Sequence, residues 1–195
     1  MQRVNFFKRK HVVEIAEVSL ARAVIASVVW GFPRGGRPGG KYLDFVRLFD
    51  RAGDLALELE ELRSRPRSAA EGLEAIKSEG VGFATTSKIV YFAGVSFQEG
   101  PALIFDANVI KTLVAGTGIA SLGFESTKAC LGSGKSYDKA ASAYSVYVKE
   151  ATALAARLSE GLKRPVDPDQ IETALFLASV RPGVWGWENE PVEQI

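Results

Sequence analysis

The sequence contains few residues of the kinds that bind metals or form disulfides. Its 195 residues include one cysteine, Cys130, and one histidine, His11. A single cysteine excludes a disulfide framework and a cysteine-ligated iron–sulfur cluster, and a single histidine excludes a zinc site built from several histidines. We therefore expect neither a metal site nor a cofactor.

The sequence also lacks an excess of one charge and any long apolar run. The 24 lysines and arginines nearly balance the 23 aspartates and glutamates, which leaves a net charge of +1. Global charge gives no reason to expect a nucleic-acid partner, so any DNA binding must be local. The charged N-terminal stretch leads into no long apolar run, and we expect no signal peptide, no membrane span and a cytoplasmic location.

Apolar residues make up a large share of the chain. They account for 47% of the sequence, which argues against disorder and is enough for a substantial core. We expect residues 1–195 to form a single domain with an irregular tail from about residue 182, and we expect the protein to be a monomer.

Along most of the chain these apolar residues recur at helical spacing. No alternation of polar and apolar residues is long enough to predict a sheet, and the Gly/Ser-rich stretch before residue 137 is expected to be a link. The predicted fold class is therefore all-α. The expected helices cover about 12–30, 42–49, 55–62, 68–77, 86–93 and 137–162, with further helix starts near 107 and 168.

Three predicted helix starts carry capping residues. Ser68 and Glu71 have the spacing of a capping box, and Asp167-Pro168-Asp169-Gln170 supplies a cap, a first-turn proline and a polar third position. Asp106 stands where an N-cap would, just before an apolar helical pattern. Gly80-Val81-Gly82 interrupts the pattern between two predicted helices, so residues 68–94 are expected to form a helix, a tight turn and a helix.

The stretch from Gly31 to Lys41 is rich in glycine, proline and arginine and is predicted to be a loop. It nearly matches a nucleotide-binding P-loop, but Tyr42 stands where a serine or threonine is needed, and a helix precedes it instead of a strand. Two interpretations stay open. The stretch is a flexible surface loop, or its Arg34, Arg37 and Lys41 lie along a phosphate backbone.

The segment Glu79-Gly80-Val81-Gly82, followed by Lys88 and Asp106, resembles the core of the helix-hairpin-helix DNA glycosylases. The run from Gly82 to Gly94, with Leu103-Ile104-Phe105-Asp106, is similar to the bacterial 8-oxoguanine DNA glycosylase fold proteins. The resemblance covers about residues 68–115 and is diffuse elsewhere. It implies a compact helix-hairpin-helix glycosylase-like helical domain, and it implies double-stranded DNA with a damaged or modified base as the partner.

Physical chemistry agrees with this implied function. A glycine hairpin that opens a helix exposes backbone amides, so Gly80, Val81 and Gly82 can hold a DNA phosphate without side-chain charge. A base must leave the duplex before its glycosidic bond can be reached, and an anchored strand keeps the distorted DNA in place. Two aromatic residues that border the basic loop, Trp30 and Phe32, are the candidates for stacking on the flipped base.

The resemblance implies that Asp106 is the catalytic carboxylate. In the family, the matching aspartate starts the helix after the hairpin and stabilises the positive charge that builds up on the sugar. An aspartate in front of a helix is more often only a cap, worth about 1 kcal/mol. The position of Asp106 after the hairpin favours catalysis, and a cap role is compatible with it.

Lys88 is the candidate nucleophile for strand cleavage. Family members that cleave the strand use a lysine at the position that Ala84 occupies here, and Lys88 lies one helical turn later on the same face. The alternative is a lysine that extends to solvent or to a phosphate, which would make the enzyme a glycosylase without lyase activity.

The sequence thus predicts excision of a damaged base, an 8-oxoguanine-like purine, in DNA repair. An alternative within the same class is excision of hypermodified bases from phage DNA, as a defence. Outside this class, the chain is a non-catalytic DNA-binding module that only grips phosphate, or a helical domain that binds proteins, which its near-neutral charge favours.

Overall fold

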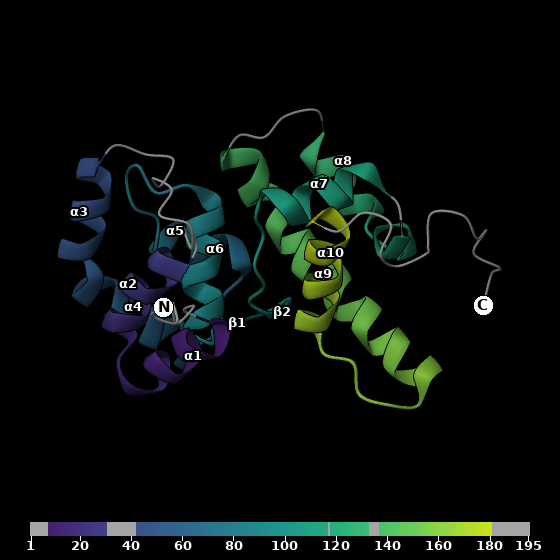
Figure 1. The fold of residues 1–195 in the computed structure, drawn as a ribbon, viewed down its shortest axis with the longest axis horizontal. Coiled ribbons are helices and arrows are strands. Elements are labelled where there is room, and N and C mark those ends of the chain that lie inside the picture. The colour runs from purple at the N-terminus through teal and green to yellow at the C-terminus, as the bar shows by residue number, and fades with distance from the viewer. Residues whose placement is uncertain (1–7, 31–41, 117, 133–136, 181–195) are drawn as a thin grey trace, which may run out of the picture. The chain divides into compact units, whose positions relative to one another are not determined.

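The computed structural model describes residues 8–30, 42–116, 118–132 and 137–180 (Figure 1). These residues form ten α-helices, one short 3-10 helix and one pair of short strands, so the predicted all-α class is confirmed. Within the same residues, no helix combines the length and apolarity that crossing a lipid bilayer requires. The predicted loop 31–41 and the predicted irregular tail from about 182 lie outside the described residues.

The chain divides into two compact units, Met1–Ile104 and Phe105–Ile195. Units of this kind can belong to one domain, so the single-domain assignment stays a prediction. The first unit, purple to teal in Figure 1, contains α1 (Arg9–Val18), α2 (Leu20–Trp30), α3 (Tyr42–Asp50), α4 (Ala52–Ser64), α5 (Ala69–Ala75), α6 (Phe83–Phe92), β1 (Ser96–Phe97) and β2 (Gly100–Pro101). The second contains α7 (Ala107–Ala115), η1 (Gly118–Leu122), α8 (Glu125–Leu131), α9 (Tyr137–Leu162) and α10 (Pro168–Val180).

The core of the first unit forms around α2, which packs against α1, α4 and α6. Leucines on one face of α4 are fully buried, as the helical spacing of their sequence predicts. On α6 the buried residues are mostly β-branched or aromatic, and on α2 alanine and valine predominate. The main buried side chains of these three helices are Val24, Val28, Leu55, Leu59, Leu62, Val90 and Phe92.

The second unit is built on the long helix α9, which packs against α8 and α10. Tyr144 and Tyr147 of α9 are fully buried, and the Tyr147 ring stacks on Phe105 with 4.6 Å between ring centroids. Helix α10, yellow in Figure 1, also packs against α7. Because α7 begins right after Asp106, this packing fixes the helix whose start carries the candidate carboxylate.

Three expectations from the sequence are wrong in detail. The single helix expected over 12–30 is broken at Ser19, which has extended backbone angles and whose Oγ accepts a bond from the Arg22 amide, as a cap residue does. Strands β1 and β2 form an antiparallel pair. They have two residues each, too few to show an alternating pattern. The expected link before residue 137 contains η1 and α8.

The predicted capping box at Ser68 is confirmed, and α10 begins at Pro168, as predicted. The Ser68 Oγ accepts from the Glu71 amide at 3.3 Å, and the Glu71 carboxylate accepts from the Ser68 amide at 3.2 Å. At the start of α10, the Asp167 amide donates to the Gln170 side chain at 2.9 Å. Each bond satisfies a donor that a helix start leaves without an intrahelical partner.

The capping box at Ser68 makes stability depend on pH. Hydrogen bonds from the Ser68 hydroxyl and amide, with the charge of Arg67, lower the pKa of Glu71 below its ordinary value of 4.5. A carboxyl whose pKa is lowered by folding stabilises the fold above its unfolded pKa, and the effect is lost as the pH falls through the folded value. The stabilisation is therefore complete above pH 4.5 and declines below it.

We predict that Ser68→Ala lowers the free energy of unfolding by about 1 kcal/mol at pH 7, because the cap is lost. The difference from the wild type should narrow as the pH falls below 4.5, because Glu71 becomes protonated as the pH passes its lowered pKa. Urea titrations at several pH values measure this. Ser64→Ala is the control, because the Ser64 hydroxyl only bonds back to Glu61 of its own helix. A difference that stays constant down to the lowest pH at which the protein still folds would contradict the role of Glu71.

Candidate functional site

The predicted turn between two helices is present, and glycine shapes it. Helix α5 ends at Ala75 and α6 begins at Phe83. Gly80 has φ +74°, a left-handed conformation that favours glycine, and the Val81 amide donates to the Ser78 carbonyl at 3.1 Å. Gly82 is the N-cap of α6. We call residues 79–82 the hairpin.

Gly82 leaves the start of α6 open. Its φ of −70° suits any residue, and a Cβ built on it would meet no heavy atom within 4 Å. Neither conformation nor packing inside the protein therefore requires a glycine here. As the cap, Gly82 also offers no side-chain hydrogen bond, while the first amides of a helix have no intrahelical acceptor. This helix start has the chemistry and the space to bind an anion.

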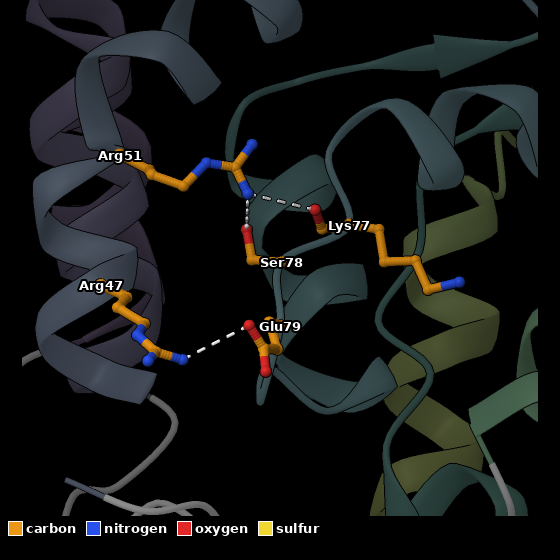
Figure 2. A network of polar contacts seen from close by, with 5 residues as sticks. All are labelled: Arg47, Arg51, Lys77, Ser78 and Glu79. Atoms are coloured by element: carbon orange, nitrogen blue, oxygen red, sulfur yellow. Dashed lines mark hydrogen bonds and ion pairs between the residues drawn. The ribbon is translucent and has the colours of Figure 1, made fainter. Parts of the chain in front are cut away.

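Two arginines, one near the end of α3 and one just before α4, contact the first residue of the hairpin and the two residues before it (Figure 2). We call these two arginines the α3–α4 corner. Arg51 donates to the Lys77 carbonyl at 3.4 Å and to the Ser78 hydroxyl at 3.2 Å. Arg47 forms an ion pair with Glu79 at 3.3 Å. No local pattern in the sequence indicates these contacts, since they join residues far apart in the chain and neither arginine belongs to a recognisable motif.

The structure brings two predicted residues, Lys88 and Trp30, together in the first unit. The Lys88 Nζ lies 5.8 Å from the centroid of the Trp30 ring. The Arg9 guanidinium lies 5.8 Å from the same centroid and 4.8 Å from that of Tyr91, and it donates to the Tyr91 hydroxyl at 3.3 Å. All four side chains are partly buried. We call Arg9, Trp30, Lys88 and Tyr91 the aromatic–cation cluster.

Helix α6 is regular from Phe83 to Phe92, so Ala84 and Lys88 lie one turn apart on the same face, as expected. Arg9 was missed because it precedes the apolar pattern that predicted the first helix, which begins three residues earlier than expected. Helical periodicity identifies buried faces and gives no signal for a cation that lies over an aromatic ring.

Next to Trp30 and Tyr91 of this cluster, four buried side chains pack together: Val12, Ala26, Phe92 and Ile104. Trp30 and Tyr91 pack against them, and the Trp30 and Phe92 rings meet edge to face at 5.1 Å. Ile104 belongs to the segment 102–105, whose side chains are all buried. The residues that lead to Asp106 are therefore fixed by burial in the core.

In the second unit, Asp106 is the N-cap of α7, as predicted. Its Oδ1 accepts from the Asn108 amide at 3.0 Å and from the Val109 amide at 3.2 Å, and the residue is partly buried. The carboxylate is thus held in one orientation by its own helix. Its cap role is confirmed, and its catalytic role stays a prediction.

Helix α10 holds the helix that Asp106 starts. The Thr112 hydroxyl donates to the Leu175 carbonyl at 2.8 Å, and both residues are buried. Near the first turn of α7, the Ser179 hydroxyl donates to the Asn108 side chain at 3.4 Å. These two contacts fix α7 at both of its ends.

Four predicted site residues lie outside the described residues: Phe32, Arg34, Arg37 and Lys41. Their roles in base stacking and phosphate binding stay predictions. In the part of the chain that the structure describes, no three His, Cys, Asp or Glu side chains gather in a way that could hold a metal ion.

Comparison with known proteins identifies a family to which the chain is similar. No curated protein and no solved structure matches the chain. The model of a protein family described as "Putative 8-oxoguanine DNA glycosylase OGG-like protein" matches residues 1–176 of the 195. The match includes the hairpin, the aromatic–cation cluster and Asp106, and the chain belongs to this OGG-like DNA glycosylase family.

Proposed function

We propose that this protein excises a damaged base, an 8-oxoguanine-like purine, from double-stranded DNA, with Asp106 as its catalytic carboxylate. The observation that carries the proposal is the family match, which spans both the hairpin and Asp106. The local structures described above support it, because each has the chemistry that one step of base excision needs.

The first step is to hold the DNA backbone. The first amides of α6 and the open space at Gly82 suit a phosphate that approaches the backbone closely. Binding through amides is independent of net charge, so a protein with a net charge of +1 can use it. We propose that Gly80, Val81 and Gly82 grip a phosphate, with Arg34, Arg37 and Lys41 as further contacts.

The second step is to hold the flipped base. Aromatic rings stack on any base. Cations next to such a ring attract the phosphates that flank the flipped nucleotide. Trp30 and Tyr91 supply rings and Arg9 supplies a cation in one partly buried cluster. We propose this cluster as a stacking surface, with Phe32 as a further candidate.

The third step is to break the bond between the sugar C1′ and the base nitrogen. The electron pair of this bond leaves with the base, which takes up a proton, and positive charge develops on the sugar. A carboxylate fixed beside the charge lowers the barrier, and it can accept a proton from the water that adds to C1′. Because two amides hold the Asp106 Oδ1, the carboxylate is oriented before a substrate arrives.

Lys88 is proposed as the nucleophile for a subsequent strand cleavage. In place of water, its neutral Nζ would bond to C1′ as the base leaves and would lose a proton. The C1′–O4′ bond of the sugar ring then breaks, O4′ takes up a proton, and the nitrogen electron pair forms the C1′=N Schiff base. Elimination then removes a proton from C2′, forms a double bond between C2′ and C3′, and breaks the bond between C3′ and its phosphate oxygen, which departs with the electron pair. Partial burial and a position one turn from Ala84 on α6 support this role.

We predict that Asp106→Asn lowers base release by about 100-fold or more, because an amide carries no charge to stabilise the sugar cation. Stability should stay near that of the wild type, since asparagine caps helices as well as aspartate does, whereas Asp106→Ala should lose about 1 kcal/mol. The assay uses duplexes with oxidised, alkylated, deaminated and phage-type modified bases. Urea titrations measure stability.

Asp167→Asn is the matched control, since it changes the aspartate before α10 in the same unit and should leave base release unchanged. Unchanged turnover in Asp106→Asn would contradict the mechanism. If the wild type binds DNA but releases no base from any duplex, the protein is a DNA-binding module without glycosylase activity.

For Lys88, we predict that borohydride traps the wild type on DNA and that Lys88→Ala forms no adduct. Borohydride reduces a Schiff base to a stable amine, so the adduct reports the covalent step and not binding alone. Lys149→Ala, an exposed lysine on α9, should trap as the wild type does. Base release by the wild type without any adduct would show that water is the nucleophile.

A further inference from the structure

The ion pair between Arg47 and Glu79 lies beside the hairpin and is open to solvent. Its Nη1–Oε2 distance is 3.3 Å, and the two side chains are 58% and 85% exposed. An exposed pair of this kind adds little to stability, because water screens both charges. It can therefore be exchanged for another partner at little cost to the fold.

Arg51, one helical turn further along, has a different role. Its amide donates to the Arg47 carbonyl at 3.1 Å, so the two arginines follow helical geometry and lie on the same face. The Arg51 guanidinium holds the Lys77 carbonyl and the hydroxyl of Ser78, which is only 7% exposed. Arg51 thereby fixes the backbone that leads into the hairpin (Figure 2). Of the two arginines, Arg47 can exchange its partner more easily, because its ion pair with Glu79 is exposed.

The charges around the hairpin indicate which group could replace Glu79 as the partner of Arg47. Glu79 directly precedes Gly80, so its negative charge lies close in the chain to the amides proposed to bind a phosphate and opposes binding of that anion. Lys77, the nearest other cation along this loop, forms an ion pair with Glu74 at 3.1 Å. Arg47 is therefore the group that neutralises Glu79, and its five donors can bind phosphate in the same way as carboxylate.

We propose that Arg47 binds a DNA phosphate next to the one held by the hairpin, and that Glu79 competes with DNA for it. This inference rests on the proposed DNA binding by the hairpin. Glu79 holds Arg47 in the free protein, and DNA displaces the carboxylate. The α3–α4 corner thus extends the phosphate-binding surface, and Glu79 weakens binding to every DNA sequence alike.

The test measures the affinity of the full chain for a labelled, unmodified duplex by fluorescence anisotropy over a range of salt concentrations. Arg47→Ala should weaken binding about fivefold at moderate salt, and the slope of log K against log salt should become less steep by about 0.9, as expected for one lost phosphate contact. Glu79→Gln should tighten binding about threefold, because Arg47 is released and one repulsive charge is lost.

Two further variants make the test specific. Glu61→Gln removes the same charge from another exposed Glu–Arg pair, that of Glu61 and Arg67, and should leave affinity unchanged. In the double variant Arg47→Ala/Glu79→Gln, the second change should tighten binding by clearly less than threefold, because release of Arg47 no longer contributes and only the loss of one repulsive charge remains. A Glu79→Gln effect of full size without Arg47 would overturn the competition.

Gly82→Ala separates this inference from the proposed function. If the wild type binds DNA and Gly82→Ala weakens binding, the hairpin contacts DNA as proposed. Unchanged affinity and an unchanged salt slope in Arg47→Ala would then overturn only the role of Arg47. Absence of binding by the wild type at low salt would overturn both. Thermal unfolding of each variant shows whether a change in affinity reflects loss of fold.

Discussion

The packing of Phe92 against Val12, Ala26 and Ile104 is the contact on which the first unit depends. It joins α1, α2, α6 and the segment that leads to Asp106 in one apolar cluster. Because Phe92 ends α6, its burial also sets the rotation of that helix, and this rotation brings Lys88 over the Trp30 ring. Arg9 reaches the same ring from α1. A hydrophobic contact thereby positions the polar groups proposed to meet the substrate.

Three helix starts show how one backbone property serves different purposes. Each helix begins with amides that lack an intrahelical acceptor. At α5, Ser68 and Glu71 satisfy them and the helix is stabilised. At α7, the Asp106 carboxylate satisfies two of them and is itself oriented by the bonds. At α6, Gly82 supplies no side-chain acceptor. The residue at the cap therefore decides what the helix start does. It stabilises the helix at α5, it orients a carboxylate at α7, and at α6 no side chain occupies it.

Much of this could be predicted from the sequence, because the signals are local. Helical periodicity gave most helices, and the capping patterns at Ser68 and Asp106 gave their starts. The break at Ser19 lies inside a continuous apolar pattern, and two-residue strands cannot show a period. The contacts of Arg51 with Ser78 and of Arg9 with Trp30 join distant residues through exposed or partly buried side chains. Such pairings depend on which helices pack against each other, and a single sequence contains no pattern that identifies the partners.

The open start of α6 also has a consequence for protein engineering. A search for thermostable variants would replace Gly82 early, because serine or aspartate caps a helix better than glycine and the position has room for either. Aspartate would add a second carboxylate to the hairpin, at the position proposed to bind a phosphate. Under the proposed function, stability and DNA affinity therefore oppose each other at this one residue, and a library sorted only by melting temperature would become enriched in proteins that bind DNA less tightly.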